Sequence, residues 1–112
     1  MSEGVTLGST IRRLRQSAGL NQRQLADRVQ VSATYVSHLE SGRREPSIQI
    51  LRRLAQELQV PPGLLLGIVM WTELPAEQRE PYRKLLDNLV ELAQLERLRL
   101  ELDDDAEPPM GD

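Results

Sequence analysis

The side chains that could do chemistry lie between Asn21 and Arg44. The sequence has one histidine, His38, and no cysteine. No nucleophile pair and no cluster of metal ligands accompanies His38, whereas a zinc site needs three or four clustered ligands. No glycine-rich phosphate loop follows a strand pattern. We therefore expect no enzymatic activity, no cofactor and no metal ion.

The stretch NQRQLADRVQVSATYVSHLESG, residues 21–42, predicts two short helices joined by a tight turn. Asn21 and Ser32 are residues that cap helix N-termini, and Gly42 can end the second helix. The apolar spacing turns Val36 and Leu39 towards a core. The second helix would then expose Ala33, Thr34, Ser37 and His38. Such short side chains let a helix approach a partner closely, and a duplex major groove admits one helix.

The run LNQRQLADRVQVSATYVSHLESGRREPS resembles the helix-turn-helix of Cro and the phage repressors, the Xre-type regulators. The matching elements are Gln22 after the cap, Ala26 at the helix crossing, Val31-Ser32 at the turn, Tyr35-Val36-Ser37, Leu39-Glu40-Ser41-Gly42 and Pro46-Ser47. The resemblance extends from about Leu7 to Leu66. Gln30 departs from it, since these proteins often have glycine there. A positive φ at Gln30 would cost roughly 1 kcal/mol or more.

The resemblance and the residue types together indicate how DNA would be contacted. Matching family positions assign base reading to Ala33, Thr34, Ser37 and His38, and a structural salt bridge to Arg15 and Glu40. Gln22 lies at a helix N-terminus, where backbone N–H groups can meet a phosphate. The expected phosphate contacts are Gln22, Arg23, Tyr35, Ser41, Arg43 and Arg44. Tyr35 has a second interpretation, in which it only covers the core. None of the base readers can make a bidentate contact, which leaves more of the specificity to DNA shape.

The whole chain is predicted to be all-α. A first helix over about Ser9–Ser17, capped by Ser9 or Thr10, precedes the motif, and Arg12 and Arg13 should face solvent. A fourth helix follows the cap Ser47, with an inner face of Ile48, Leu51, Leu54, Ala55 and Leu58. Prolines 61 and 62 start a short fifth helix over Leu64–Leu66. Residues 1–67 would form a five-helix repressor-like domain after a frayed arm, Met1–Gly8.

Residues 68–102 are expected to form an oligomerisation segment. A short helix should start near Leu74-Pro75-Ala76-Glu77, and a long one should run from Pro81 to about Leu102. Two apolar rows follow it, one of Leu86, Val90, Ala93, Arg97 and Leu100, the other of Leu85, Leu89, Leu92, Leu95 and Leu98. Nothing in the first domain is expected to cover this face. We therefore expect dimerisation through Leu85, Leu86, Leu89, Val90, Leu92 and Ala93. The alternative is that the helix folds back onto its own domain.

Charge divides the chain in the same way. Residues 1–67 hold nine Arg, no Lys and five acidic residues, a net charge of +4, whereas residues 68–112 carry −7. A basic half joined to an acidic half indicates nucleic-acid binding in one and a separate task in the other. The acidic tail, residues 103–112, contains two prolines and is predicted to be disordered. No apolar stretch has the length of a signal sequence or membrane span, so we expect a cytoplasmic protein.

These features predict a sequence-specific transcriptional regulator, most simply a repressor. A homodimer would bind double-stranded DNA at an inverted repeat through the recognition helix Ser32–Leu39, with half-sites about one turn apart. One alternative is an antitoxin or controller-type regulator. Another is a protein-interaction module whose C-terminal half binds a partner protein.

Overall fold

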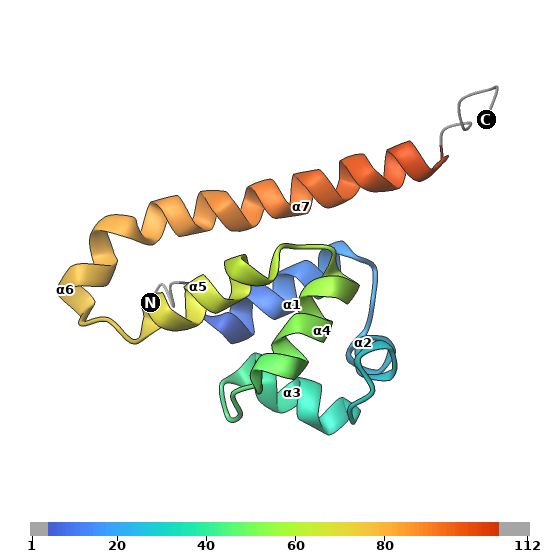
Figure 1. Ribbon diagram of the computed structural model, residues 1–112, viewed down its shortest axis with the longest axis horizontal. Helices are drawn as coiled ribbons and strands as arrows, with labels where there is room; N and C mark the ends of the chain where they lie inside the picture. The colour runs from blue at the N-terminus through green and yellow to red at the C-terminus, as the bar shows by residue number, and fades with distance from the viewer. Residues whose placement is uncertain (1–4, 106–112) are drawn as a thin grey trace.

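The computed structural model describes residues 5–105, and the side chains of residues 5–102. Helices are the only regular secondary structure in this part of the chain (Figure 1). They are α1 (Leu7–Ser17), α2 (Gln22–Val29), α3 (Ala33–Ser41), α4 (Ile48–Leu58), α5 (Pro62–Thr72), α6 (Ala76–Arg79), the 3-10 turn η1 (Glu80–Tyr82) and α7 (Arg83–Asp105). The all-α prediction is confirmed.

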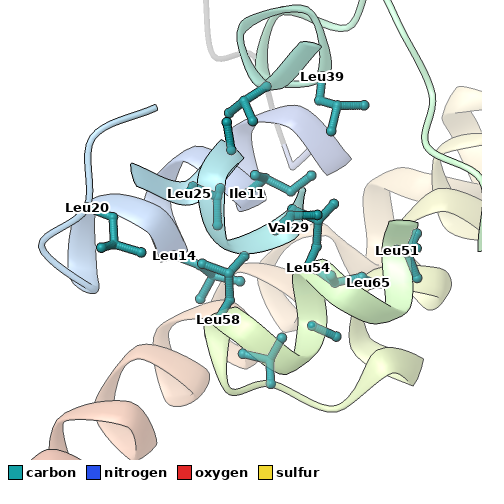
Figure 2. Packing of buried hydrophobic residues seen from close by; sticks show 14 residues of the cluster. Ile11, Leu14, Leu20, Leu25, Val29, Leu39, Leu51, Leu54, Leu58 and Leu65 are labelled. Atoms are coloured by element: carbon teal, nitrogen blue, oxygen red, sulfur yellow. The ribbon is translucent and has the colours of Figure 1, made fainter. Parts of the chain in front are cut away.

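Helices α1 to α5 enclose one aliphatic core (Figure 2). Each helix contributes residues at three- and four-residue spacing, which places them on one face. The fully buried members include Ile11 of α1, Leu25 of α2, Leu54 of α4 and Leu65 of α5. Burying one such side chain stabilises the fold by about 1.5–3 kcal/mol. Ile48, which was predicted to lie on the inner face of α4, is instead 63% exposed at the first residue of that helix.

The first helix begins earlier than predicted. Thr6, rather than Ser9 or Thr10, is its N-cap, and Thr6 and Ser9 each bind the other's backbone N–H at 3.0 Å. This reciprocal pair is a capping box. Val5 is buried just ahead of it, so residues 5–8 are not a frayed arm. Residues 1–4 of that predicted arm lie outside the described residues.

The fifth helix is longer than predicted and crosses the expected domain boundary at residue 67. Helix α5 continues through Gly67 to Thr72, because Leu65 and Ile68, three residues apart, are both fully buried on one face. Helix α6 follows where a short helix was expected. Helix α7 then runs to Asp105, so the first three residues of the predicted disordered tail are helical. Residues 106–112 lie outside the described residues.

Helix α7 lies across the first domain, alongside α1 and α5 (Figure 1). Val90 is fully buried against Val5 and Ile68, with Leu86 packed at the edge of this cluster, and Ala93 contacts the main core. The expectation that nothing in the chain covers this helix is therefore wrong for Leu86, Val90 and Ala93. Periodicity identified the apolar rows but not their partner, which depends on how residues 73–82 turn the chain.

Polar contacts also join α7 to α1. Arg13, expected to face solvent, donates to Gln94 Oε1 at 3.2 Å and lies 3.7 Å from Asp87. Gln94 also donates to the hydroxyl of Ser17. Arg97 is 7% exposed and lies 3.3 Å from Glu101. By contrast, Leu85, Leu89 and Leu92 remain exposed.

Candidate nucleic-acid interface

The turn between α2 and α3 is built from local side-chain bonds. Asn21 Oδ1 accepts the backbone N–H of Gln24 at 2.8 Å, and Gln24 Oε1 accepts that of Asn21 at 2.9 Å. Ser32 Oγ accepts the N–H of Tyr35 at 3.0 Å and so caps α3. Between them, Gln30 ends α2 in the left-handed region with φ of 67°. The positive φ considered for Gln30 is therefore present.

Helix α3 has a buried and an open side, as its spacing predicted. Val36 and Leu39 are buried in the core, whereas Thr34 is exposed and Ser37 and His38 are half-buried. Ala33, also expected to face outward, is half-buried and packs against the core at the start of α3. We call the side of α3 that bears Thr34, Ser37 and His38 its open flank, because none of these side chains is buried.

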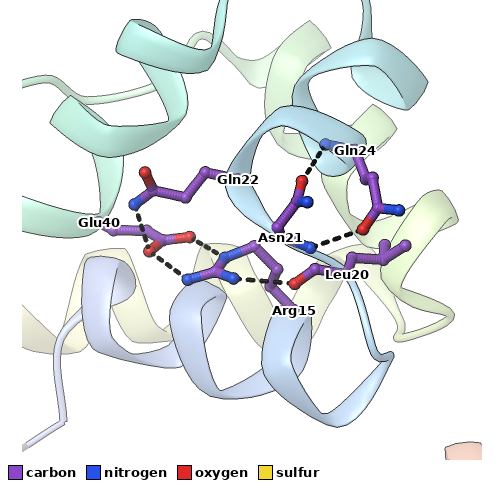
Figure 3. A network of polar contacts seen from close by, with 6 residues as sticks. All are labelled: Arg15, Leu20, Asn21, Gln22, Gln24 and Glu40. Carbon is purple, nitrogen blue, oxygen red and sulfur yellow. Dashed lines mark hydrogen bonds and ion pairs between the residues drawn. The ribbon is translucent and has the colours of Figure 1, made fainter.

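One polar network joins α1, α2 and α3 (Figure 3). Arg15 Nε and Nη2 donate to the two carboxylate oxygens of Glu40 at 2.6 and 3.0 Å, which is the predicted salt bridge in bidentate form. Arg15 Nη1 also donates to the carbonyl oxygen of Leu20 at 2.8 Å. The side chains of Arg15 and Glu40 are only 10% and 4% exposed. Fully partnered charges in this setting fix the position of α3 relative to α1.

Gln22 is also part of this network, and its contact with Glu40 was not predicted from the sequence. Its amide nitrogen donates to Glu40 Oε1 at 3.1 Å, so the side chain predicted to meet a phosphate also holds α2 to the end of α3. Gly8 is a second position missed from sequence. A Cβ there would lie 2.4 Å from the backbone oxygen of Glu40, so α1 and α3 cross at a point that excludes any side chain. A glycine in the first turn of an amphipathic helix was the available signal.

Exposed basic side chains lie in the segments that precede and follow α3 in the chain. Arg23, at the start of α2, and Arg43 and Arg44, after α3, are all exposed. The backbone N–H groups of Arg43 and Arg44 both donate to the carbonyl oxygen of His38, at 2.9 and 3.2 Å, which ties the loop to the last turn of α3. The hydroxyl of Ser41 is exposed and donates to the same carbonyl oxygen at 3.2 Å.

Tyr35 had two interpretations; its ring does cover the core, and a phosphate contact through its hydroxyl group stays a prediction. The ring is half-buried and packs against the main core. The guanidinium carbon of Arg44 lies over this ring, 5.6 Å from its centroid, within the range of a cation–π contact. Tyr35 therefore supports the position of Arg44.

The described part of the chain offers neither a metal site nor a membrane-spanning helix. Among the side chains of residues 5–102, no group of three or more His, Cys, Asp or Glu residues could hold a metal ion. In the same part of the chain, no helix has the length and apolar character needed to span a membrane.

Comparisons with known proteins agree with this geometry. The helix-turn-helix family pattern matches residues 11–65. Transcriptional regulator ClgR of Mycobacterium tuberculosis is 37% identical over 60 residues, which cover 54% of each chain, so this chain spans about half the length of that relative. The HTH-type transcriptional regulator y4dJ of Sinorhizobium fredii is 44% identical over 54 residues, 48% of this chain and 70% of that one.

Among solved structures, the P22 c2 repressor in complex with a synthetic operator is similar, with a TM-score of 0.53 and 31% identity. The match covers 55% of this chain and 92% of the repressor chain. The prediction that the chain is not an enzyme agrees with relatives that are transcriptional regulators. The chain belongs to the helix-turn-helix family of transcriptional regulators, of the Xre type to which its sequence is similar.

Proposed function

We propose that this protein is a repressor that binds double-stranded DNA in the cytoplasm and reads an inverted-repeat operator as a homodimer through α3. The observation that carries this proposal is the network of Arg15, Glu40 and Gln22, which fixes an open helix flank between two basic segments. The similarity of 55% of this chain to a repressor crystallised in complex with a synthetic operator supports it.

Phosphate contacts would supply most of the affinity and would set the position of the domain. Arg23 would contact the backbone on one side of α3, and Arg43 and Arg44 on the other. Gln22 would present the N-terminus of α2 to a phosphate while its amide stays bonded to Glu40. Because backbone N–H groups of the 43–44 loop are fixed on His38, little ordering of this loop would accompany binding.

Base reading would rest on the open flank of α3. The hydroxyl groups of Thr34 and Ser37 and the ring of His38 can exchange hydrogen bonds with base edges, and Ala33 or the Thr34 methyl can contact a thymine methyl. These contacts are few for one protomer. Two copies would double them, and the exposed leucines 85, 89 and 92 of α7 offer a surface for pairing.

A second function is favoured by the same exposed leucines. They would also suit an apolar surface of another protein, as in an antitoxin or controller-type regulator or a protein-interaction module. In that case a partner protein would occupy α7, and DNA binding would be absent or would depend on that partner.

Selection of duplexes from a random library by the full-length protein tests the proposal. We expect an enriched inverted repeat whose affinity falls steeply as salt rises. Enrichment of a single half-site would retain DNA binding and remove the dimer. Failure to enrich any sequence at low salt would overturn the proposal in favour of protein interaction. The variant Ser37→Ala should change the enriched sequence but not the salt dependence, because it removes a base contact and no charge.

A further inference from the structure

The long helix α7 is apolar on two opposite sides. Its inner side, with Leu86, Val90 and Ala93, is covered by α1, α5 and the segment before α1. Its outer side has an uncovered row of leucines, each 40–63% exposed: Leu85, Leu89, Leu92, Leu95, Leu98 and Leu102. We call these six residues the outer row. A surface helix needs only the inner side for its own fold, so the outer row lacks a purpose within the chain.

The spacing of the outer row is symmetric. Successive members are separated by 4, 3, 3, 3 and 4 residues, so the row reads the same from either end. Leu89 and Leu98 are nine residues apart, about two and a half turns, so they point to opposite sides of the helix. Two copies of α7 placed antiparallel about a two-fold axis would therefore pair the other four leucines, and Leu89 and Leu98 would flank the contact. Leu85 and Leu92 are seven residues apart, and so are Leu95 and Leu102, which is the heptad spacing of a left-handed coiled coil.

We propose that the outer row is the contact surface for a second copy of this chain, in antiparallel orientation. Leu85 would lie opposite Leu102 of the partner subunit, and Leu92 opposite Leu95 of the partner subunit. This deepens the homodimer of the proposed function and rests on it for its role at DNA. A two-fold contact of this kind uses the same patch on both copies, so the dimer is closed and no third copy can add to it.

The charges of α7 favour antiparallel over parallel pairing. In parallel pairing each leucine would lie opposite its own copy, so the leucines alone do not determine the orientation of the two helices. However, α7 begins with Arg83 and Lys84 and ends with Asp103, Asp104 and Asp105. Antiparallel pairing brings the basic start of one helix to the acidic end of the other, whereas parallel pairing brings six aspartates together. The helix dipoles are opposed only in the antiparallel arrangement.

The proposal has a consequence for the operator. Helices α7 and α3 lie at opposite edges of the molecule, which measures 33 Å in this direction (Figure 1). With paired helices about 8–10 Å apart, the two copies of α3 would be separated by roughly 50–70 Å. This exceeds the roughly 34–36 Å of one helical turn of DNA. We therefore expect half-sites about two turns apart, wider than the single turn that the sequence suggested.

Single-cysteine variants test the orientation directly, because the natural sequence has no cysteine. Leu85→Cys and Leu102→Cys would be made separately, with tags of different size, and treated with a short bismaleimide alone and as a mixture. Such a reagent links two nearby thiols without the strict geometry that a disulfide requires. Antiparallel pairing predicts a cross-linked product in the mixture and little in either variant alone. Cross-linking of each variant with itself would overturn the antiparallel arrangement.

Sedimentation separates this proposal from the proposed function. We expect the parent protein to be a dimer and Leu92→Glu to be a folded monomer, since Leu92 is 59% exposed and its loss leaves the core intact. Leu92→Ala and the helical circular dichroism of both variants control for misfolding. If Leu92→Glu is folded and still dimeric, the outer row is not the interface. If the parent is monomeric yet binds a half-site in the library selection, the pairing is overturned while DNA binding stands.

Discussion

The variant Glu40→Gln tests whether the buried network holds the interface in place. Gln keeps the shape of Glu and leaves no cavity, so the change is confined to charge and hydrogen bonding. Arg15 would keep its bond to the carbonyl oxygen of Leu20 but would lose a full negative charge at 2.6 and 3.0 Å. One end of the new amide also carries donors, which cannot accept from the guanidinium.

The size of the effect follows from burial. Because the Arg15 and Glu40 side chains are 10% and 4% exposed, water cannot replace the lost partner. Removing one member of a buried pair costs about 3–5 kcal/mol. That is a large part of the total stability of a small domain, about 5–15 kcal/mol. The melting temperature should therefore fall by roughly 10 °C or more.

Urea unfolding followed by circular dichroism measures this loss, with Glu45→Gln as the matched control. Glu45 is exposed, so its substitution should stay within about 0.5 kcal/mol of the parent. The double variant Arg15→Met, Glu40→Leu removes both charges. Its free energy of unfolding should fall by less than the sum of the losses of the two single variants. A Glu40→Gln protein within about 1 kcal/mol of the parent would refute the conclusion that this pair fixes α3.

Three further predictions concern the interface and the backbone. Arg43→Ala should weaken binding to all duplexes alike and make the slope of log K against log salt shallower by about 0.9. Arg52→Ala, at an exposed position on α4, is the control and should leave the slope unchanged. An unchanged slope for Arg43→Ala would exclude a phosphate contact. Gln30→Gly should raise the free energy of unfolding by about 0.5–1 kcal/mol, because the φ of 67° at this position strains any residue with a Cβ; a lower urea midpoint would contradict this. Gly8→Ala should destabilise by about 1–3 kcal/mol, since its Cβ would lie 2.4 Å from a backbone oxygen. Gly63→Ala is its control, because a Cβ at Gly63 would have nothing within 4 Å. Equal urea midpoints for the two variants would show that α1 and α3 can move apart at little cost.

Local chemistry could be predicted well from sequence, because the information it needs lies within a few residues. The caps Asn21, Ser32 and Ser47 and the left-handed Gly42 were all predicted and are all present. Each cap depends on one side chain that accepts a free backbone N–H at the start of a helix. Gly42 depends only on the ability of glycine to take a left-handed backbone conformation at the end of one. The first helix shows the limit of such reasoning, since three neighbouring hydroxyl residues could cap it and the reciprocal bonds of Thr6 and Ser9 decided the choice.

The sequence by itself determined an all-α chain, its turn motif, the apolar faces of its helices and, through family resemblance, the Arg15–Glu40 pair. Tertiary structure decided what each face touches. It placed Gln22 on Glu40, Gly8 against the end of α3, and one of the two apolar rows of α7 against α1 and α5 while leaving the other open. The physical reason is that periodicity fixes which residues share a side of a helix. The covering partner is instead chosen by contacts between segments far apart in the chain.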